Sequence, residues 1–187
     1  GIDPAAGGDK SAIVLKSGNL QEVLFNQKLQ NTMDLVGVIM DKYRESHADY
    51  MVIDKTGVGQ GVFDRLQELD YPCRGVSFGE KSEDPQFGNL KAEWHWRQRE
   101  WLLSGGRLLH NADWNEFEIV KYKNKDGKII IQPKEELFKE GLSSPNVVDA
   151  AVLTQVVRDS TVKSTRIIKQ MRGREFHDET NRIWRNE

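Results

Sequence analysis

Three aspartates are the residues of this sequence best placed to do chemistry. Asp3 lies at the end of the first predicted strand, Asp54 ends the apolar run 49–54, and Asp149 lies in an otherwise apolar predicted helix. A bare carboxylate buried in such surroundings is costly, so it must be capped, paired or metal-bound. Carboxylates without His or Cys partners are hard oxygen ligands that suit Mg²⁺ or Mn²⁺. Taken singly, each Asp is more often a cap or an ion-pair partner, but together the three predict a site for divalent ions.

The segment GGDKS near the start of the chain resembles a phosphate-binding loop. The Walker pattern needs a Gly directly before the Lys, whereas Asp9 lies between Gly8 and Lys10. A carboxylate in a phosphate nest repels a phosphate, so ATP binding is disfavoured. Asp9, together with Asp3, is therefore interpreted as part of a site that favours negative charge and hence a cation, with a plain turn residue as the alternative.

The composition limits the classes of protein to consider. The chain has 187 residues, of which 37% are hydrophobic and 30% charged, which predicts one globular domain. No apolar run approaches the roughly 18 residues of a membrane helix, and no signal peptide pattern is present. The single cysteine, Cys73, excludes an internal disulfide and a zinc cluster. A reducing, intracellular setting is expected.

These aspartates must be positioned by a mixed sheet flanked by helices, the α/β class. Periodicity predicts a hairpin of strands 11–16 and 20–26, further strands at 49–54, 73–78 and 129–132, and helices at 32–46, 62–69, 89–104, 113–122, 134–140 and 143–157. Asn31 or Thr32 is expected to cap the first helix and Ser144 the last. The predicted domain covers 1–160, and 161–187 is expected to form a polar, basic tail.

Five segments of the sequence resemble the C-terminal nuclease domain of the large terminase subunit of tailed bacteriophages, which has an RNase H-like fold. They are GIDPAAGGDKSA, VIDKTGVGQGVFDRL, FGNLKAEWHWRQREWLLSGG, IIIQPKEELFKE and SSPNVVDAAVLT, and they follow one another in the family's order over residues 1–157. The first segment is also similar to the phosphate loop of sugar kinases and actin-like ATPases, so the ordered series carries the resemblance.

The resemblance implies a metal-dependent endonuclease that cuts concatemeric viral double-stranded DNA by two-metal phosphodiester hydrolysis. Asp3, Asp54 and Asp149 would be the catalytic metal ligands, and Asp9 would assist at the second of two Mg²⁺ or Mn²⁺ ions. The family commonly has an Asp where this chain has Asn146, which brings no charge to the second ion.

The resemblance also implies partners. DNA would contact Lys10 and a lysine-rich hairpin with Lys123, Lys125 and Lys128, although solvated lysines are the alternative. A terminase ATPase domain N-terminal to Gly1, the small terminase subunit and the portal protein would be protein partners. The expected location is the host cell cytoplasm, without membrane attachment.

Other features have weaker functional interpretations. The stretch TGVGQG at 56–61 resembles a dinucleotide loop, but Val62 stands where its third Gly is needed, so a turn is predicted. Lys91 and Glu93 match the helix start of the family that the sequence resembles, where a polar group faces the active-site cleft. The histidines show no ligand spacing and receive no role; they are His47, His95, His110 and His177. The alternatives to a nuclease are a sugar-kinase or actin-like nucleotide-binding domain and a non-catalytic docking module of the packaging motor.

Overall fold

A six-stranded mixed sheet forms the centre of the computed structural model, which describes residues 1–5 and 8–157. The strands lie in the order β5–β4–β1–β2–β3–β6, with bounds Cys73–Val76, Met51–Asp54, Ile2–Asp3, Ser11–Ser17, Leu20–Gln27 and Arg107–Leu108. β1 is parallel to β4 and antiparallel to β2, while β2 and β3 form the antiparallel hairpin. The expected mixed α/β architecture, with three antiparallel strands first, is confirmed.

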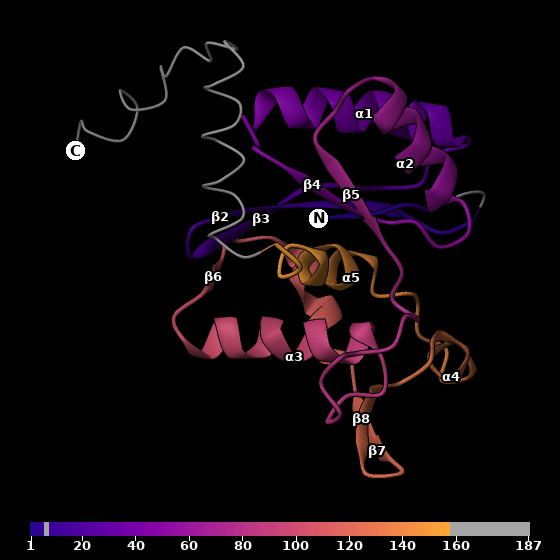
Figure 1. Ribbon diagram of the computed structural model, residues 1–187, viewed down its shortest axis with the longest axis vertical. Helices are drawn as coiled ribbons and strands as arrows, with labels where there is room; N and C mark the ends of the chain where they lie inside the picture. The colour runs from indigo at the N-terminus through magenta and orange to yellow at the C-terminus, as the bar shows by residue number, and fades with distance from the viewer. Residues whose placement is uncertain (6–7, 158–187) are drawn as a thin grey trace. The chain divides into compact units, whose positions relative to one another are not determined.

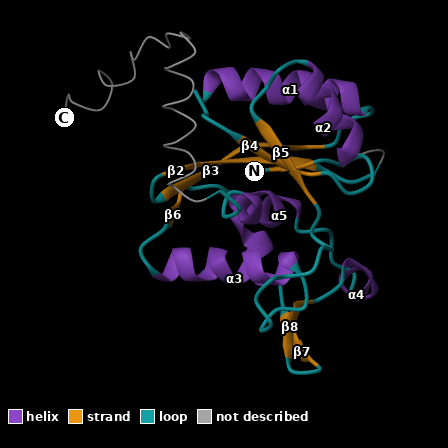
Figure 2. Cartoon of the chain, viewed as in Figure 1, coloured by secondary structure: helices purple, strands orange, loops and turns teal. Residues whose placement is uncertain are grey.

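Helices cover both faces of the sheet (Figures 1 and 2). α1 (Thr32–Glu45) and α2 (Gly59–Glu68) lie on one face, and α5 (Asn146–Leu153) lies on the other, backed by α3 (Leu90–Leu103). The 3₁₀ helix η1 (Ala112–Glu118) packs beside α5. α4 (Lys134–Lys139) follows a two-stranded hairpin of β7 (Tyr122–Lys125) and β8 (Lys128–Ile131), which projects away from the sheet.

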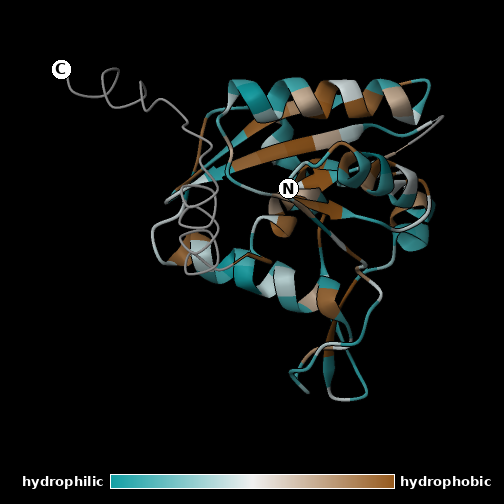
Figure 3. Cartoon of the chain, turned by 45° about the horizontal axis from the view of Figure 1, so that its top comes forward, coloured by the Kyte–Doolittle hydropathy of each residue, from teal (hydrophilic) through white to brown (hydrophobic). Residues whose placement is uncertain are grey.

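Alternating side chains divide the core between the two faces of the sheet. Ile2, Ile13 and Ile53 pack with α1 and α2, whereas Val52 and Val14 belong to clusters that include α5 residues. Figure 3 shows predominantly hydrophobic strands between helices in which hydrophilic and hydrophobic residues alternate. Because every residue of α5 is buried, that helix holds its polar side chains inside the protein.

The structure corrects two of the expected helix boundaries. α2 begins at Gly59, inside the stretch interpreted as a turn. A glycine is needed at this position, because a Cβ at Gly59 would lie 1.9 Å from the carbonyl oxygen of Asp54. Asn31 caps α1 as expected, but Ser144 does not cap α5, since the capping position is Pro145 and makes no side-chain hydrogen bond. The short strand β6 was not predicted.

Residues 158–187 lie outside the described part, so the domain boundary at 160 and the tail 161–187 remain predictions. Within residues 1–5 and 8–157, no helix is both long and apolar enough to cross a membrane.

Candidate active site

Asp3 and Asp54 are neighbours at the ends of two parallel strands. Ile2 pairs with Ile53 across β1 and β4, so the next residue of each strand is an aspartate, and adjacent strands lie roughly 4.8 Å apart. Both isoleucines point toward α1 and α2, so both aspartates point toward the opposite face. Asp3 is buried and Asp54 is half-buried. Asp54 also accepts hydrogen bonds from the backbone N–H and the hydroxyl of Thr56, at 2.9 and 2.7 Å.

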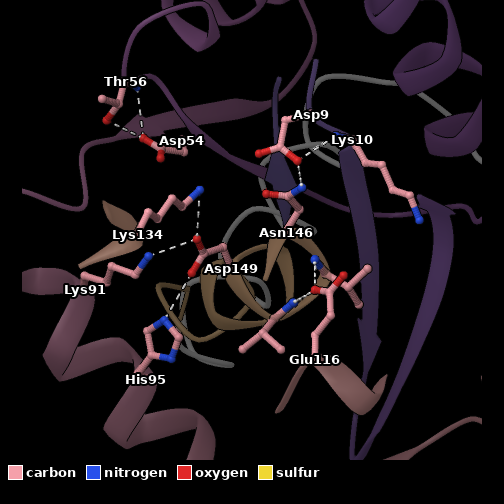
Figure 4. Close-up of polar contacts among 12 residues, drawn as sticks. Asp9, Lys10, Asp54, Thr56, Lys91, His95, Glu116, Lys134, Asn146 and Asp149 are labelled. Atoms are coloured by element: carbon pink, nitrogen blue, oxygen red, sulfur yellow. Dashed lines mark hydrogen bonds and ion pairs between the residues drawn. The ribbon is translucent and has the colours of Figure 1, made fainter. Parts of the chain in front are cut away.

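Asp149 reaches the same face of the sheet from α5, which packs on β1 and β2. Its fully buried carboxylate is surrounded by three nitrogen groups (Figure 4). Lys91 Nζ lies 2.9 Å from Oδ2, Lys134 Nζ lies 3.4 Å from the same oxygen, and His95 Nε2 lies 3.2 Å from Oδ1. These groups come from α3 and α4, so three separate helices meet at this carboxylate.

The cationic neighbours keep Asp149 ionised. Burial alone would raise the pKa of Asp149, but Lys91, the hydrogen bond from His95 and Lys134 together hold that pKa well below its ordinary value. Burial would likewise lower the pKa of Lys134, yet the nearby carboxylates, chiefly Asp3 and Asp149, raise it. Asp149 and Lys134 therefore form an ion pair across the pH range in which proteins are ordinarily folded.

Asp3 has the opposite electrostatic environment. Burial raises its pKa well above the ordinary value, the negative charge of Asp149 raises it further and that of Asp54 adds a smaller effect, while Lys134 and Lys91 lower it. The charges of Asp149 and Asp54 thus both act on Asp3, and the three carboxylates are referred to below as one cluster. Three carboxylates in one cluster, one of them disfavoured as an anion, form an environment that additional positive charge would stabilise.

His95 orients Asp149 as a neutral hydrogen-bond donor. Burial, together with the charge of Lys91, lowers its pKa by more than the hydrogen bond to Asp149 and the charge of Asp149 raise it. Since the carboxylate can only accept, the Nε2 atom of the imidazole must carry the proton of this bond. His95 lies four residues after Lys91, one helical turn along α3, so both side chains contact Asp149 from the same face of that helix.

Asp9 and Asn146 form a second polar contact close to the start of α5. The amide nitrogen of Asn146 donates to Asp9 Oδ1 at 2.7 Å. One helical turn separates Asn146 from Asp149, but Asp149 binds Lys91, Lys134 and His95 while Asn146 binds Asp9. Asp9 is thus tied to α5 through Asn146.

Glu116 caps α5 from η1, which was not anticipated. Its Oε2 atom accepts hydrogen bonds from the backbone N–H groups of Val147 and Val148, at 2.7 and 3.3 Å. Burial raises the pKa of Glu116 to about 7, although these two hydrogen bonds act in the opposite direction. Carboxylate capping from another segment compensates for the missing local cap at Pro145.

The lysines predicted to bind DNA lie outside this cluster. Lys10 is exposed beside Asp9, and Lys125 is exposed at the hairpin turn, with Lys128 half-buried next to it. Lys123 forms an ion pair with Glu136 of α4. The structure thus brings Asp3, Asp54 and Asp149 together, joins Asp9 to α5, and leaves the hairpin lysines at a separate projection.

The donor set of the cluster suits a divalent cation, but the described side chains do not enclose one as they stand. Asp3, Asp54 and Asp149 supply only oxygen atoms, the ligands that Mg²⁺ and Mn²⁺ prefer. In the described ranges, no group of three or more His, Cys, Asp or Glu side chains is arranged so that it could hold a metal ion. The two ammonium groups instead lie against Asp149.

Sequence reasoning assigned no role to three residues of this region. Lys134 and Glu116 gave no signal, because their positions depend on how α4 and η1 pack. His95 was set aside because it has no ligand spacing, although its position four residues after Lys91 placed both on one face of a predicted helix.

Solved structures with this fold were found by comparison, whereas no family model and no curated protein sequence matches the chain. The nuclease domain of the large terminase subunit gp2 of bacterial virus Sf6 superposes with a TM-score of 0.71 at 17% identity, covering 82% of this chain and 85% of that chain. A mutant of that domain with manganese and beta-thujaplicinol gives 0.70 at 16% identity, covering 82% and 85%. A mutant with calcium gives 0.71 at 17% identity, covering 82% and 86%.

The chain therefore has the RNase H-like fold of these terminase nuclease domains, as the ordered sequence segments implied. At such low identity the likeness establishes the fold, and the chemistry must be argued from the residues of this chain.

Proposed function

We propose that this protein is a metal-dependent DNA endonuclease of a phage DNA-packaging terminase. The observation that carries the proposal is the convergence of Asp3, Asp54 and Asp149 on one face of the sheet, where burial and the other carboxylates raise the pKa of Asp3. In such a cluster the carboxylates repel one another when ionised, and a bound divalent ion would reduce that repulsion. The shared fold and the manganese and calcium named with its solved relatives support the same interpretation.

Asp3, Asp54 and Asp149 would hold the ions, with Asp9 assisting at the second of two Mg²⁺ or Mn²⁺ ions. Bound ions of this kind lower the pKa of water and stabilise charge on a departing phosphodiester oxygen. The protein's own contribution is to fix the carboxylates. β1 and β4 align Asp3 with Asp54, and His95 fixes Oδ1 of Asp149. Lys91 and Lys134 must withdraw from Oδ2 before that oxygen can bind an ion.

Double-stranded DNA would contact Lys10, beside Asp9, and the lysines of the β7–β8 hairpin. Lys10, Lys123, Lys125 and Lys128 are the candidates, since phosphate contacts by lysine supply most non-specific DNA affinity. In packaging, the substrate would be concatemeric viral DNA. The ATPase domain of the terminase, the small terminase subunit and the portal protein would be the partners in the host cytoplasm.

Plasmid nicking with matched variants tests the proposal. Supercoiled plasmid is incubated with the protein in Mg²⁺, in Mn²⁺ and in EDTA. We expect nicking with the metals, none in EDTA, and none with Asp54→Ala. Asp64→Ala is the control, because Asp64 is an exposed α2 aspartate whose carboxylate accepts a hydrogen bond from Gln60, four residues earlier in the same helix. Circular dichroism checks that both variants fold.

The outcomes separate the candidate functions. Nicking by Asp54→Ala at the rate of the wild type would refute the assignment of the site. No nicking by the wild type, together with a melting temperature that Mn²⁺ leaves unchanged, would favour the non-catalytic docking module.

A further inference from the structure

Thr56 donates two hydrogen bonds to a single oxygen atom of Asp54 (Figure 4). Its backbone N–H lies 2.9 Å from Oδ1 of Asp54, and its hydroxyl lies 2.7 Å from the same atom. A carboxylate oxygen has two lone pairs, so these two donors occupy the acceptor capacity of Oδ1. The oxygen that Asp54 can offer to an ion is therefore Oδ2.

The backbone around Asp54 fixes the place of Thr56. The N–H of Lys55 donates to the carbonyl of Val76 at 2.8 Å, which holds the chain against β5 directly after Asp54. The N–H of Gly59 donates to the carbonyl of Thr56 at 3.2 Å, and a Cβ at Gly59 would lie 1.9 Å from the carbonyl oxygen of Asp54. The turn thus closes tightly onto the end of β4, and Thr56 is held beside the carboxylate by the fold.

Asp149 has a similar division between its two oxygens. His95 Nε2 lies 3.2 Å from Oδ1 of Asp149, whereas the ammonium groups of Lys91 and Lys134 both lie at Oδ2. In Asp54 and in Asp149, a neutral donor of the protein therefore engages Oδ1. Bidentate binding of an ion needs both oxygens of a carboxylate, so these donors disfavour it at both residues.

The number of oxygens that a carboxylate presents affects which ion it suits. Ca²⁺ takes roughly six to eight oxygen ligands and often binds a carboxylate through both oxygens. Mg²⁺ requires a nearly ideal octahedral arrangement and keeps several waters, and Mn²⁺ also takes octahedral oxygen sites. Carboxylates limited to one oxygen each therefore suit the two smaller ions better than Ca²⁺.

We propose that Thr56 is a positioning residue that determines the ion preference of the aspartate cluster. By occupying Oδ1 of Asp54, it limits this carboxylate to contact through Oδ2 and favours Mg²⁺ or Mn²⁺ over Ca²⁺. The proposal rests on the proposed nuclease function, in which Asp54 is a metal ligand. Thr56 acts through Asp54 and needs no contact of its own with the ion or with DNA.

Melting temperatures measured in EDTA, in Mn²⁺ and in Ca²⁺ test this preference without any cleavage. An ion that binds the folded protein raises its melting temperature according to the ion's affinity, so a concentration series gives an apparent affinity for each ion. The wild type should have a higher apparent affinity for Mn²⁺ than for Ca²⁺. Asp54→Ala removes the carboxylate and should remove most of this preference with it.

Thr56→Val removes the hydroxyl group and keeps both the branched shape and the backbone N–H bond. One lone pair of Asp54 Oδ1 then becomes available, so the ratio of the Mn²⁺ affinity to the Ca²⁺ affinity should fall about three- to tenfold, the equivalent of one hydrogen bond. Thr56→Ser keeps the hydroxyl and should retain the ratio of the wild type. Gln60→Ala is the matched control, because it removes a neutral donor, 2.7 Å from Oδ1 of Asp64, outside the cluster.

A purely structural role of Thr56 would give a different result. In that case Thr56→Val would lower the melting temperature in EDTA and leave the ratio of the two affinities unchanged, which would overturn the proposal. A wild-type melting temperature that responds to neither ion would also overturn it.

The failures of this proposal and of the nuclease function are distinguishable. If the wild type nicks plasmid with Mn²⁺ and Thr56→Val keeps the ratio of the wild type, the proposal for Thr56 fails by itself. If the ratio falls in Thr56→Val but the wild type nicks no plasmid with either Mg²⁺ or Mn²⁺, the role of Thr56 in ion preference is supported and the nuclease assignment fails.

Discussion

Replacing Lys91 by Met should destabilise the protein and make it more responsive to metal. Lys91 Nζ lies 2.9 Å from Asp149 Oδ2, with 17% of the lysine side chain and 1% of the aspartate side chain exposed. The lysine also lies over the ring of Phe78, with Nζ 5.1 Å from its centre. Because Met has a similar length and an apolar stem, Lys91→Met keeps the packing and removes the charge.

The size of the effect follows from the burial of this ion pair. At 2.9 Å and an effective dielectric constant of about 20, the Coulomb attraction is about 6 kcal/mol before desolvation. Removing one partner of a buried pair costs about 3–5 kcal/mol, and here Lys134 and His95 still contact Asp149. We therefore expect a loss of about 3 kcal/mol in the free energy of unfolding, or about 6–12 °C in melting temperature.

Melting curves in EDTA and in Mn²⁺ measure both parts of this prediction. In the wild type, an ion must displace Lys91 and Lys134 from Oδ2, whereas in Lys91→Met one of these competitors is absent. Mn²⁺ should therefore raise the melting temperature of the variant by more than that of the wild type. The destabilisation should also shrink as the pH falls below 3.8, the ordinary pKa of Asp149, because the stability contributed by its lowered pKa is complete above that value and is lost progressively as the pH falls toward the folded-state pKa.

Lys42→Met is the matched control. Lys42 Nζ lies 2.7 Å from Glu45 Oε2, but 32% of the lysine and 62% of the glutamate side chain are exposed. Exposed pairs contribute about 0–1 kcal/mol, so the control should melt within about 2–4 °C of the wild type in both buffers. Equal destabilisation by the two variants would refute the assigned strength of the Asp149 cluster. An equal response to Mn²⁺ in Lys91→Met and the wild type would refute competition between ammonium and metal.

Three further predictions use the same melting assay or chemical denaturation. Asp3→Asn should raise the stability at neutral pH by about 0.5–2 kcal/mol and abolish plasmid nicking, because the raised pKa of Asp3 marks an anion that destabilises the fold. Glu116→Gln should gain stability relative to the wild type as the pH rises from 4.5 to about 7. The protonated carboxyl of Glu116 stabilises the wild type fully below pH 4.5, the ordinary pKa, and this stabilisation is lost as the pH rises through the folded-state pKa of about 7. Gln98→Ala should cost about 2–4 kcal/mol in urea denaturation, because it leaves the buried amide of Gln21, bonded to Gln98 at 3.0 and 2.7 Å, short of partners.

The elements that could be read from the sequence are those whose pattern comes from local burial. Leu35, Val36 and Ile39 recur at helical spacing, and α1 indeed buries them. The strand Met51–Asp54 was expected from its apolar run. α5 was predicted too long, because Thr154 and Gln155 are drawn into a buried polar network with Gln21 and Gln98. β6 has only two residues and depends on pairing with β3, so it leaves no periodic signal.

The site was predictable to the extent that it follows from strand order. Asp3 and Asp54 end parallel strands of one sheet, and ligands gather at such ends. The partners of Asp149 were not predictable, because the contact of Lys134 depends on where α4 docks after a projecting hairpin. Glu116 caps a helix that follows it by thirty residues of sequence, which no local capping rule anticipates.

The two lysines at Asp149 differ in how easily they can leave it. Lys91 is 17% exposed and is held against Phe78, whereas Lys134 is 38% exposed and its Nζ lies 3.4 Å away. Withdrawal of Lys134 into solvent would remove one positive charge from a cluster in which the carboxylates already disfavour the anion of Asp3. A divalent ion entering in its place restores that charge and adds another. Because the gain in charge falls on Asp3, Asp54 and Asp149 together, exchange of Lys134 for an ion is the first step, before displacement of Lys91 from Oδ2, by which this cluster would become a metal site.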